Sequence, residues 1–314
     1  MDNDEASSAR VRPVHTIAYR PYPALRPGAR VAVVAPSGPF DRAAFEAGLA
    51  AISGRYAVSF DPGMLTRQRY LAGDDARRFA ELAAALSDPR IEAVFCARGG
   101  YGALRLLHRL DDTAIAAKAL VGFSDIVTLH AFMLRAGRIT LHAPVLTQLA
   151  RLPAPTRERL FALLESPFPA EPLHGTATYV TGTAEGPLVG GNLATLAALL
   201  GTPYAPSFEG AVLLLEEVGE RPYRLDRMWT HLALAGVFRQ VRGIVLGSFT
   251  HCEERDADFT SADVLRDLAR ATGLPCAAGF PIGHGEHNEP VALGARVRLD
   301  AAAGVLTFLE SAAG

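Results

Sequence analysis

Ser124 stands where the apolar segment 118–123 ends and a helical pattern begins, in the stretch "LVGFSDIVTLHAFML". A turn from strand to helix places a side chain at the carboxyl end of a sheet, where open α/β folds bind their ligands. The first backbone N–H groups of the helix point at the same place and can stabilise an oxyanion. Two interpretations remain open. Ser124 is a nucleophile at a tight elbow after Gly122, or it only caps the helix; position 126 is Ile, which departs from the G-x-S-x-G elbow.

A glycine-rich loop forms the second unusual segment, "CARGGYGALRLL" at 96–107. Gly99, Gly100 and Gly102 follow a buried apolar run and precede a helix. Glycines allow the backbone to approach a ligand closely and to present its N–H groups. The loop matches neither G-x-x-x-x-G-K-[ST] nor G-x-G-x-x-G, so the phosphate-binding interpretation fails. It either presents backbone donors to another ligand or is a turn that carries the exposed Arg98.

Two adjacent carboxylates, Glu216 and Glu217, end the strongly apolar segment 211–218. Neighbouring residues of a strand face opposite sides, so one carboxylate must point inward. A buried carboxylate is unfavourable unless it is paired or functional. The alternative is a surface pair at a fraying strand end.

The loop 277–294, "AAGFPIGHGEHNEPVALG", contains His284 and His287 between glycines. With Glu286 they offer three metal-ligand types, but H-E-x-x-H requires an i, i+4 spacing on a helix. The spacing here is i, i+3 in a loop, and the only other such cluster is "HCEE" at 251–254. We therefore expect no metal and no cofactor, and keep a metallohydrolase as a weak alternative.

Serine, glutamate and histidine together supply a nucleophile, an orienting acid and a general base, the logic of a catalytic triad. The order along the chain is not evidence, because the triad recurs in several orders. A Ser-x-x-Lys catalyst is excluded, because the only lysine, Lys118, is preceded by Ile115 at the required spacing.

The elements that must position these residues alternate in the first half of the chain. Strand-like and helix-like patterns follow one another, which indicates βαβ units and a parallel sheet with helices on both faces. The strand-like runs are 30–37, 56–60, 91–100, 118–123 and 138–144, and the helical ones are 41–54, 74–88, 101–110 and 124–137. The proline-rich stretch 151–173 breaks the rhythm and predicts a linker with one short helix. A second, mixed α/β domain follows, with helices at 193–201, 223–235 and 261–273.

Composition limits the classes of partner. The chain has 314 residues and a formal net charge of -2, which provides no electrostatic footprint for nucleic acid or an anionic membrane. No apolar run reaches the ~18 residues that span a bilayer. The three cysteines form no C-x-x-C pair, which is typical of free thiols in a reducing compartment. The acidic N-terminus does not resemble a signal peptide, so we expect a cytoplasmic protein.

Several motifs, taken together, resemble the LD-carboxypeptidase family of serine peptidases, which includes murein tetrapeptide carboxypeptidases and microcin C immunity peptidases. They cover about residues 28 to 310 in order, and they are "VAVVAPSGPF", "YLAGDDARR", "FCARGGYGALRLL", "VGFSDIVTLH", "GPLVGGNLATLAALLGTPY", "LLLEEVGERPYRLDRM" and "GFPIGHGEHNEPVALG". The resemblance implies that Ser124 is the nucleophile and that Glu216 and His284 complete its triad. It also implies an oxyanion hole made by the backbone N–H groups of Gly100 and Asp125.

The resemblance further implies a flavodoxin-like N-terminal domain with a parallel sheet beside a smaller mixed α/β C-terminal domain, often as a homodimer. We therefore expect an N-terminal extension at 1–27, an N-terminal domain at 28–150 with the nucleophile, a linker at 151–175 and a C-terminal domain at 176–314 with the glutamate and the histidine.

The expected activity is hydrolysis of the L,D-amide bond that releases terminal D-alanine from murein tetrapeptides during peptidoglycan recycling, with no cofactor. Arg98, Gly99 and Tyr101 are expected to bind the substrate, with Arg98 on its terminal carboxylate. One alternative is cleavage of peptidyl or aminoacyl nucleotides of the microcin C type, which an aromatic insertion able to stack on a base would favour. A weaker alternative is a non-catalytic protein that binds a small ligand on the same fold.

Overall fold

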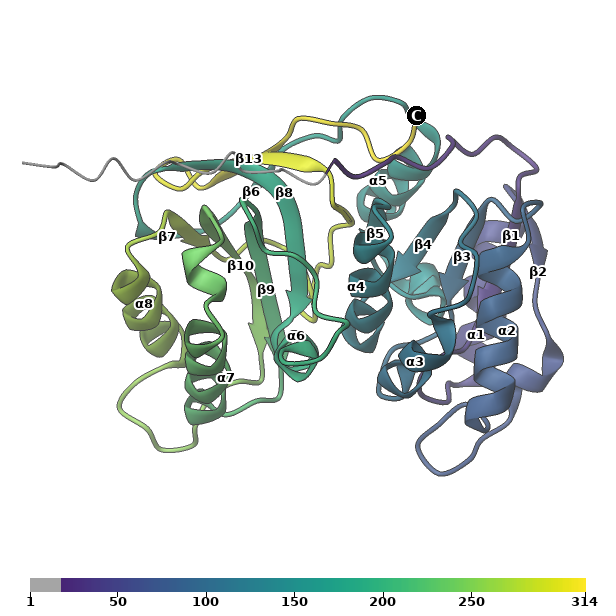
Figure 1. The fold of residues 1–314 in the computed structure, drawn as a ribbon, viewed down its shortest axis with the longest axis horizontal. Helices are drawn as coiled ribbons and strands as arrows, with labels where there is room; N and C mark the ends of the chain where they lie inside the picture. The colour runs from purple at the N-terminus through teal and green to yellow at the C-terminus, as the bar shows by residue number, and fades with distance from the viewer. Residues whose placement is uncertain (1–17) are drawn as a thin grey trace, which may run out of the picture.

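The computed structural model describes residues 18–314, and the chain forms two sheets that lie side by side (Figure 1). The first sheet has six strands. Their order is β12 (Val291–Leu293), β5 (Thr140–His142), β4 (Ala119–Gly122), β3 (Ala93–Cys96), β1 (Arg30–Val34) and β2 (Ala57–Ser59). The strands β2, β1, β3, β4 and β5 are parallel, while β12 pairs antiparallel with β5. The parallel part has the flavodoxin-like order that the sequence predicts.

Helices cover both faces of this sheet because its strands are apolar on both sides. In β1, Val31 and Val33 pack into one core while Ala32 and Val34 pack into the other. The first core contains apolar side chains of α1 (Arg42–Ser53) and α5 (Ala154–Glu165). The second core contains those of α2 (Asp75–Ser87), α3 (Leu107–Leu110) and α4 (Val127–Arg135). Short 3-10 helices occur at η1 (Pro62–Leu65), η2 (Ala103–Leu106), η3 (Ser124–Ile126) and η4 (Leu146–Arg151).

The second half of the molecule is built on an eight-stranded mixed sheet. Its order is β6 (Leu173–His174), β14 (Val305–Phe308), β13 (Arg296–Asp300), β8 (Thr183–Asn192), β9 (Val212–Val218), β10 (Gly243–Thr250), β11 (Cys276–Ala278) and β7 (Ala177–Val180). The four strands from β8 to β11 are parallel and the outer ones are antiparallel. By strand number it is the larger sheet, although the sequence predicts a smaller second domain. The helices of this half are α6 (Leu193–Leu199), α7 (Pro222–Leu234), η5 (Val237–Arg239) and α8 (Ser261–Thr272).

The two halves meet along α4, which lies between the sheets in Figure 1. All residues from Val127 to Leu134 of this helix are buried, as expected for a helix covered on every side. The helix packs against α6 and β8 of the second half. Because β12 comes from the predicted second domain but pairs with β5, the late chain also contributes a strand to the first sheet.

The segments predicted as linker and extension contribute to the core of the first half. Leu160, Leu163 and Leu164 of α5 are buried there, within the predicted linker 151–175. Of the predicted extension 1–27, residues 1–17 lie outside the described residues. Tyr22 is buried and donates from its hydroxyl to the carbonyl of Leu163 at 3.0 Å. Within residues 18–314 no helix is both long enough and apolar enough to span a bilayer.

Candidate active site

Ser124 occupies a strained turn at the carboxyl end of β4. Its φ of +65° lies in the left-handed region, which costs an L-residue roughly 1–2 kcal/mol. Such conformations persist only where the surroundings enforce them, and they cluster at functional sites. A Cβ at Gly122 would lie 3.0 Å from the side chain of Ile126, which is closer than ordinary packing. The Ile126 side chain therefore packs against Gly122, at the position where a G-x-S-x-G elbow has its last glycine.

The glycine loop after β3 lies directly against Ser124. A Cβ on Gly99 would be 2.9 Å from Cβ of Ser124 and 3.2 Å from its Oγ, so the contact requires a residue without a side chain. The carbonyl of Gly99 accepts a hydrogen bond from the backbone N–H of Gly38 at 3.0 Å. Gly100 has a φ of +104°, which is open to glycine and not to other residues without strain. The loops after β1, β3 and β4 therefore meet at the nucleophile.

Two backbone donors at this position have no partner. Within residues 18–314, neither the N–H of Gly100 nor that of Asp125 donates a hydrogen bond. Asp125 follows Ser124 in η3, whose first N–H groups are unpaired as at any helix start. Free donors next to a nucleophile can stabilise negative charge on a carbonyl oxygen under attack.

The side chain of Asp125 holds the surrounding loops together. Its carboxylate is buried and accepts from Oγ of Ser37 at 2.6 Å and from the N–H of Ala103 at 2.9 Å. Burial raises the pKa of Asp125, while these two donors oppose that shift. One carboxylate thus joins the loop after β1, the start of η2 and the turn that carries Ser124. The sequence patterns above do not single out Ser37, although a polar residue at the end of the first apolar strand is the signal that marks it.

Glu216 and His284 form a buried pair in the second half. Oε2 of Glu216 lies 2.7 Å from Nδ1 of His284 and accepts the backbone N–H of the same residue at 3.2 Å. The glutamate side chain has no exposed surface, whereas that of the histidine is 18% exposed. Because Nδ1 is engaged by the carboxylate, Nε2 of His284 is the ring atom left for a reacting group.

Glycines leave the space that this pair occupies. Gly283 has a φ of +107°, and a Cβ there would lie 2.4 Å from Oε2 of Glu216. A Cβ on Gly247 in the adjacent β10 would lie 2.4 Å from the carbonyl oxygen of Ile282 and 3.2 Å from Cβ of Glu216. The Gly-His-Gly loop can therefore lie against the end of β9 only with glycine at these positions.

Glu217 faces the opposite side of β9 and has a different role. Its carboxylate accepts from Nδ2 of Asn192 at 2.8 Å, from the N–H of Ala194 at 2.7 Å and from the N–H of Val218 at 2.8 Å. It stabilises the start of α6, because the first backbone N–H groups of a helix lack internal partners. Of the two glutamates, between which the sequence leaves the choice open, Glu216 is the one that contacts His284.

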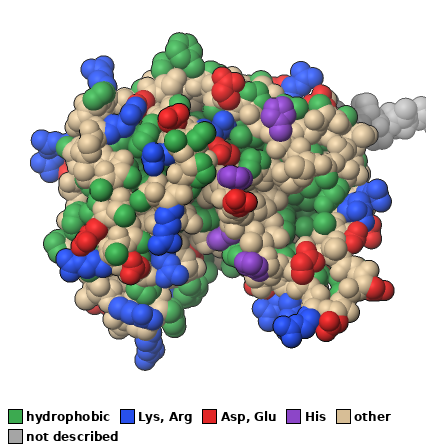
Figure 2. All heavy atoms as spheres, turned by 180° about the vertical axis from the view of Figure 1, so that it is seen from behind, with side chains coloured by type: hydrophobic (Ala, Val, Ile, Leu, Met, Phe, Trp, Pro, Cys, Tyr) green, Lys and Arg blue, Asp and Glu red, His purple; other side chains and the backbone are tan. Residues whose placement is uncertain are grey.

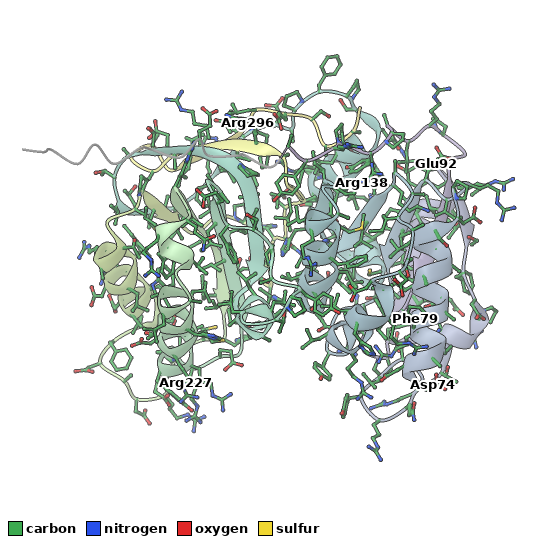
Figure 3. All side chains as sticks on the ribbon, viewed as in Figure 1. Asp74, Phe79, Glu92, Arg138, Arg227 and Arg296 are labelled. Carbon is green, nitrogen blue, oxygen red and sulfur yellow. The ribbon has the colours of Figure 1, made fainter. Side chains whose placement is uncertain are left out.

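Ser124 and His284 line one cavity of about 650 Å³ between the halves, together with Arg98, Gly99, Gly100 and Phe123. Phe40, Asp41, Thr147, Gln148, Arg151 and Val218 complete much of its wall. The ring of Phe123 lies 4.6 Å from that of His284. In Figure 3, Asp74, the N-cap of α2, lies at the lower edge of the first half. Seen from behind, histidine side chains gather along the junction of the halves (Figure 2).

The cavity carries unpaired positive charge. The ion pairs within residues 18–314 include neither Arg98 nor Arg151, and Nη1 of Arg98 donates to the carbonyl of Pro39. The carboxylate of Asp41 accepts from the N–H of Ala44 at 2.8 Å as the cap of α1. The two guanidinium groups are therefore free to pair with carboxylates of a ligand.

Three other residues considered from the sequence lie elsewhere. The Tyr101 ring lies 5.9 Å from that of Tyr70, and Tyr101 is not among the residues that line the cavity. His287 and Glu286 are exposed. No group of three or more His, Cys, Asp and Glu residues in the described part of the chain is arranged to hold a metal ion.

A strained serine beside free N–H donors, with a carboxylate-bound imidazole on the same cavity, defines the class of serine hydrolases. Comparison with known proteins places the chain within that class. Residues 31–143 match the family model of the LD-carboxypeptidase N-terminal domain, and residues 185–299 match that of the LD-carboxypeptidase C-terminal domain. The chain belongs to the LD-carboxypeptidase family and is a serine-type carboxypeptidase.

Individual relatives agree with this assignment. The murein tetrapeptide carboxypeptidase of Pseudomonas aeruginosa is 36% identical over 280 residues, covering 82% of this chain and 89% of that protein. The structure of a muramoyltetrapeptide carboxypeptidase from Oxalobacter formigenes matches with a TM-score of 0.79 and 27% identity, covering 89% and 97% of the two chains. The microcin C7 self immunity protein MccF, solved with aspartyl sulfamoyl adenosine, matches with a TM-score of 0.84 at 21% identity, covering 94% and 100%, which shows a shared fold.

Proposed function

We propose that this protein removes the terminal D-alanine of murein tetrapeptides by hydrolysing the L,D-amide bond, with Ser124, Glu216 and His284 as its catalytic triad. The observation that carries the proposal is the strained Ser124 on the same cavity as a His284 held by Glu216 at 2.7 Å. The similarity to the murein tetrapeptide carboxypeptidase of Pseudomonas aeruginosa supports the substrate class.

The reaction begins with proton transfer from Ser124. Nε2 of His284 accepts the Oγ proton as the oxygen attacks the carbonyl carbon of the scissile amide. The resulting oxyanion is stabilised by the N–H groups of Gly100 and Asp125, which need no reorganisation because neither has another partner. Glu216 stabilises the imidazolium that forms and keeps its ring oriented. His284 then donates the proton to the amine of D-alanine, which leaves as the C–N bond breaks.

Hydrolysis of the acyl-enzyme uses the same residues. A water molecule gives a proton to Nε2 of His284 and attacks the ester carbonyl, and the proton returns to Oγ of Ser124 as the shortened peptide leaves. The terminal carboxylate of the substrate requires a cation, and Arg98 is the one beside the glycine loop. Gly99 contributes by allowing close approach, while Tyr101 stands at the outside of the same loop.

A direct test is mass spectrometry of the purified protein with a murein tetrapeptide that ends in D-alanine. The proposal requires loss of one alanine residue by the wild type, in the presence of EDTA as in its absence, and no loss with Ser124→Ala. Cleavage by Ser124→Ala would show that the nucleophile is wrongly assigned. Absence of cleavage by the wild type would count against the substrate and not against the serine chemistry.

Peptidyl or aminoacyl nucleotides are the second candidate substrates, and the fold shared with the self immunity protein MccF favours testing them. The single tryptophan, Trp229, counts against them, because it is 2% exposed and stacks on Phe238 inside the second half. It is therefore not available to stack on a base. A peptidyl adenylate offered in place of the tetrapeptide distinguishes the two candidates, because a nucleotide-specific site would cleave it and leave the tetrapeptide intact.

A cytoplasmic location is part of the proposal. Cys96, Cys252 and Cys276 are all free and buried, which fits a compartment that keeps thiols reduced. The homodimer implied by family resemblance stays a prediction, and sedimentation velocity of the purified chain tests it.

A further inference from the structure

A second histidine lies behind the glutamate of the proposed triad. Nε2 of His142, at the end of β5, is 4.0 Å from Oε1 of Glu216, and both side chains are fully buried. Within the described residues, Oε1 of Glu216 and both ring nitrogens of His142 lack any hydrogen-bond partner. Buried polar atoms are almost always paired, so an imidazole and a carboxylate oxygen that face each other without partners require an explanation.

Gly191 leaves the space that the imidazole of His142 occupies. A Cβ at Gly191 of β8 would lie 3.1 Å from Cδ2 of His142 and 2.5 Å from the side chain of Val127. The ring of Phe123 lies 5.8 Å from that of His142, edge to face. The histidine is therefore held between the two halves, at the end of a strand in one half and against a strand of the other.

His142 is neutral in this environment. Burial lowers its pKa far below the ordinary histidine value, and nearby His130 and His284 shift it in the same direction. The titratable groups that face it are these two histidines and Glu216, whereas Glu217 lies on the far side of β9. A neutral imidazole has one N–H donor, and among these groups the carboxylate is the acceptor within reach of Nε2.

We propose that His142 is a positioning residue whose Nε2–H donates to Oε1 of Glu216 during the reaction, extending the triad to a chain of four residues. This inference rests on the proposed function. The distance of 4.0 Å is about 1 Å beyond a normal hydrogen bond. Catalytic hydrogen bonds are often long in the free enzyme and tighten when substrate binds.

The role follows from the charge that Glu216 must carry. When His284 becomes an imidazolium, the buried carboxylate beside it has to remain ionised to stabilise that charge. A carboxylate without a second donor takes up a proton more readily in a low-dielectric site. A donor from His142 would thus stabilise the negative charge of Glu216 and fix the rotation of its side chain.

The experiment compares His142→Gln with His142→Phe in the tetrapeptide assay over a range of pH. Glutamine places an amide N–H₂ close to the position of Nε2, whereas phenylalanine keeps the ring shape without a donor. We expect His142→Phe to lower kcat roughly 10–100-fold with KM nearly unchanged, and to move the acidic limb of kcat/KM to higher pH by about one unit or more. With His142→Gln, the acidic limb of kcat/KM is expected to lie at its wild-type pH, and most of kcat is expected to be retained.

His130→Phe is the matched control, because its imidazole is equally buried but bonds to Thr140 and Gly122 instead of the carboxylate. It is expected to lower stability and leave the acidic limb in place. Identical pH profiles for His142→Phe and His142→Gln would overturn the inference. If His142→Phe fails to fold, the histidine ring ¹⁵N spectrum of the wild type decides: the Nε2–H tautomer is required, and an Nδ1–H tautomer refutes it. An inactive Ser124→Ala alongside a refuted His142 role would leave the proposed function intact.

Discussion

Oε2 of Glu216 accepts from both the ring and the backbone of His284, so a single carboxylate oxygen fixes the orientation of the imidazole and the position of the loop that carries it. The residues are 68 positions apart, and both come from the second half of the chain. Ser124 comes from the first half, and its cavity lies between the two. Neither half contains a complete triad.

The two adjacent glutamates are predicted to respond differently to the same substitution. Glu216→Gln should lower kcat about 10³–10⁴-fold, because the amide cannot stabilise the imidazolium of His284. Glu217→Gln should leave kcat per folded molecule within a few-fold and lower the free energy of unfolding by about 1–3 kcal/mol, because a three-donor carboxylate site is lost. Steady-state kinetics and urea denaturation of both variants check this. Equal kinetic losses would mean that the orientation of β9 does not decide the role.

Because the backbone of Ser124 is strained, glycine at this position should increase stability although it removes the catalytic hydroxyl. Ser124→Ala and Ser124→Gly should both be inactive, but the glycine variant should be more stable than the alanine variant by about 1 kcal/mol, because glycine adopts a φ of +65° without strain. The difference in urea midpoint between the two variants measures it. A glycine variant less stable than the alanine variant would show that the turn is not strained.

Because Gly99 lies against Ser124, adding a single methyl group at position 99 is expected to lower kcat. Gly99→Ala would place a Cβ 2.9 Å from that of Ser124, displacing either the nucleophile or the Gly100 donor beside it. We expect kcat to fall at least about 100-fold, the scale of losing one oxyanion donor. Gly54→Ala is the control, since nothing lies within 4 Å of a Cβ there and its φ suits alanine. A control that loses as much activity would point to a general loss of folding.

Arg98 is predicted to recognise the free carboxylate of the substrate. Arg98→Gln should raise KM for the tetrapeptide about 10–100-fold, the scale of one charge-assisted hydrogen bond. A tetrapeptide with a C-terminal carboxamide should bind wild type weakly and be affected far less by the substitution. The four KM values, for the two peptides with the two proteins, form a double-mutant cycle that isolates the interaction between Arg98 and the carboxylate. Equal effects on both peptides would assign carboxylate binding to another cation, for which Arg151 on the cavity wall is a candidate.

The buried His130 is expected to make the folded protein less stable at acidic pH. Burial lowers its pKa from 6.5 to about 4, so the ring is neutral in the folded state and protonates first in the unfolded state. Its contribution is therefore complete above pH 6.5 and is lost as the pH falls towards 4, by about 3 kcal/mol in total. His142 acts in the same direction. Urea denaturation between pH 7.5 and 4.5 should show a shallower decline for His130→Gln than for wild type, and parallel curves would contradict the assignment.

Much of the local structure is determined by the sequence. Apolar runs and helical periodicity locate β1, β3, β4, β9 and the main helices, because burying an apolar face depends on spacing along a short segment. Asp41 caps α1 as its position before the helix predicts. The chemistry of the site is also readable, since the serine, the glutamate pair and the glycine-flanked histidine each end a strand or stand in a glycine-rich loop.

Only the tertiary structure decides which of these residues meet. Alternation along β9 requires Glu216 and Glu217 to face opposite sides, but which side holds His284 depends on packing against a loop far along the chain. The return of β12 to the first sheet, the space for His142 beside Gly191 and the exclusion of Tyr101 from the cavity have the same origin. These contacts join segments that are distant in sequence, and no local periodicity encodes them because each depends on how surfaces built from separate segments fit together.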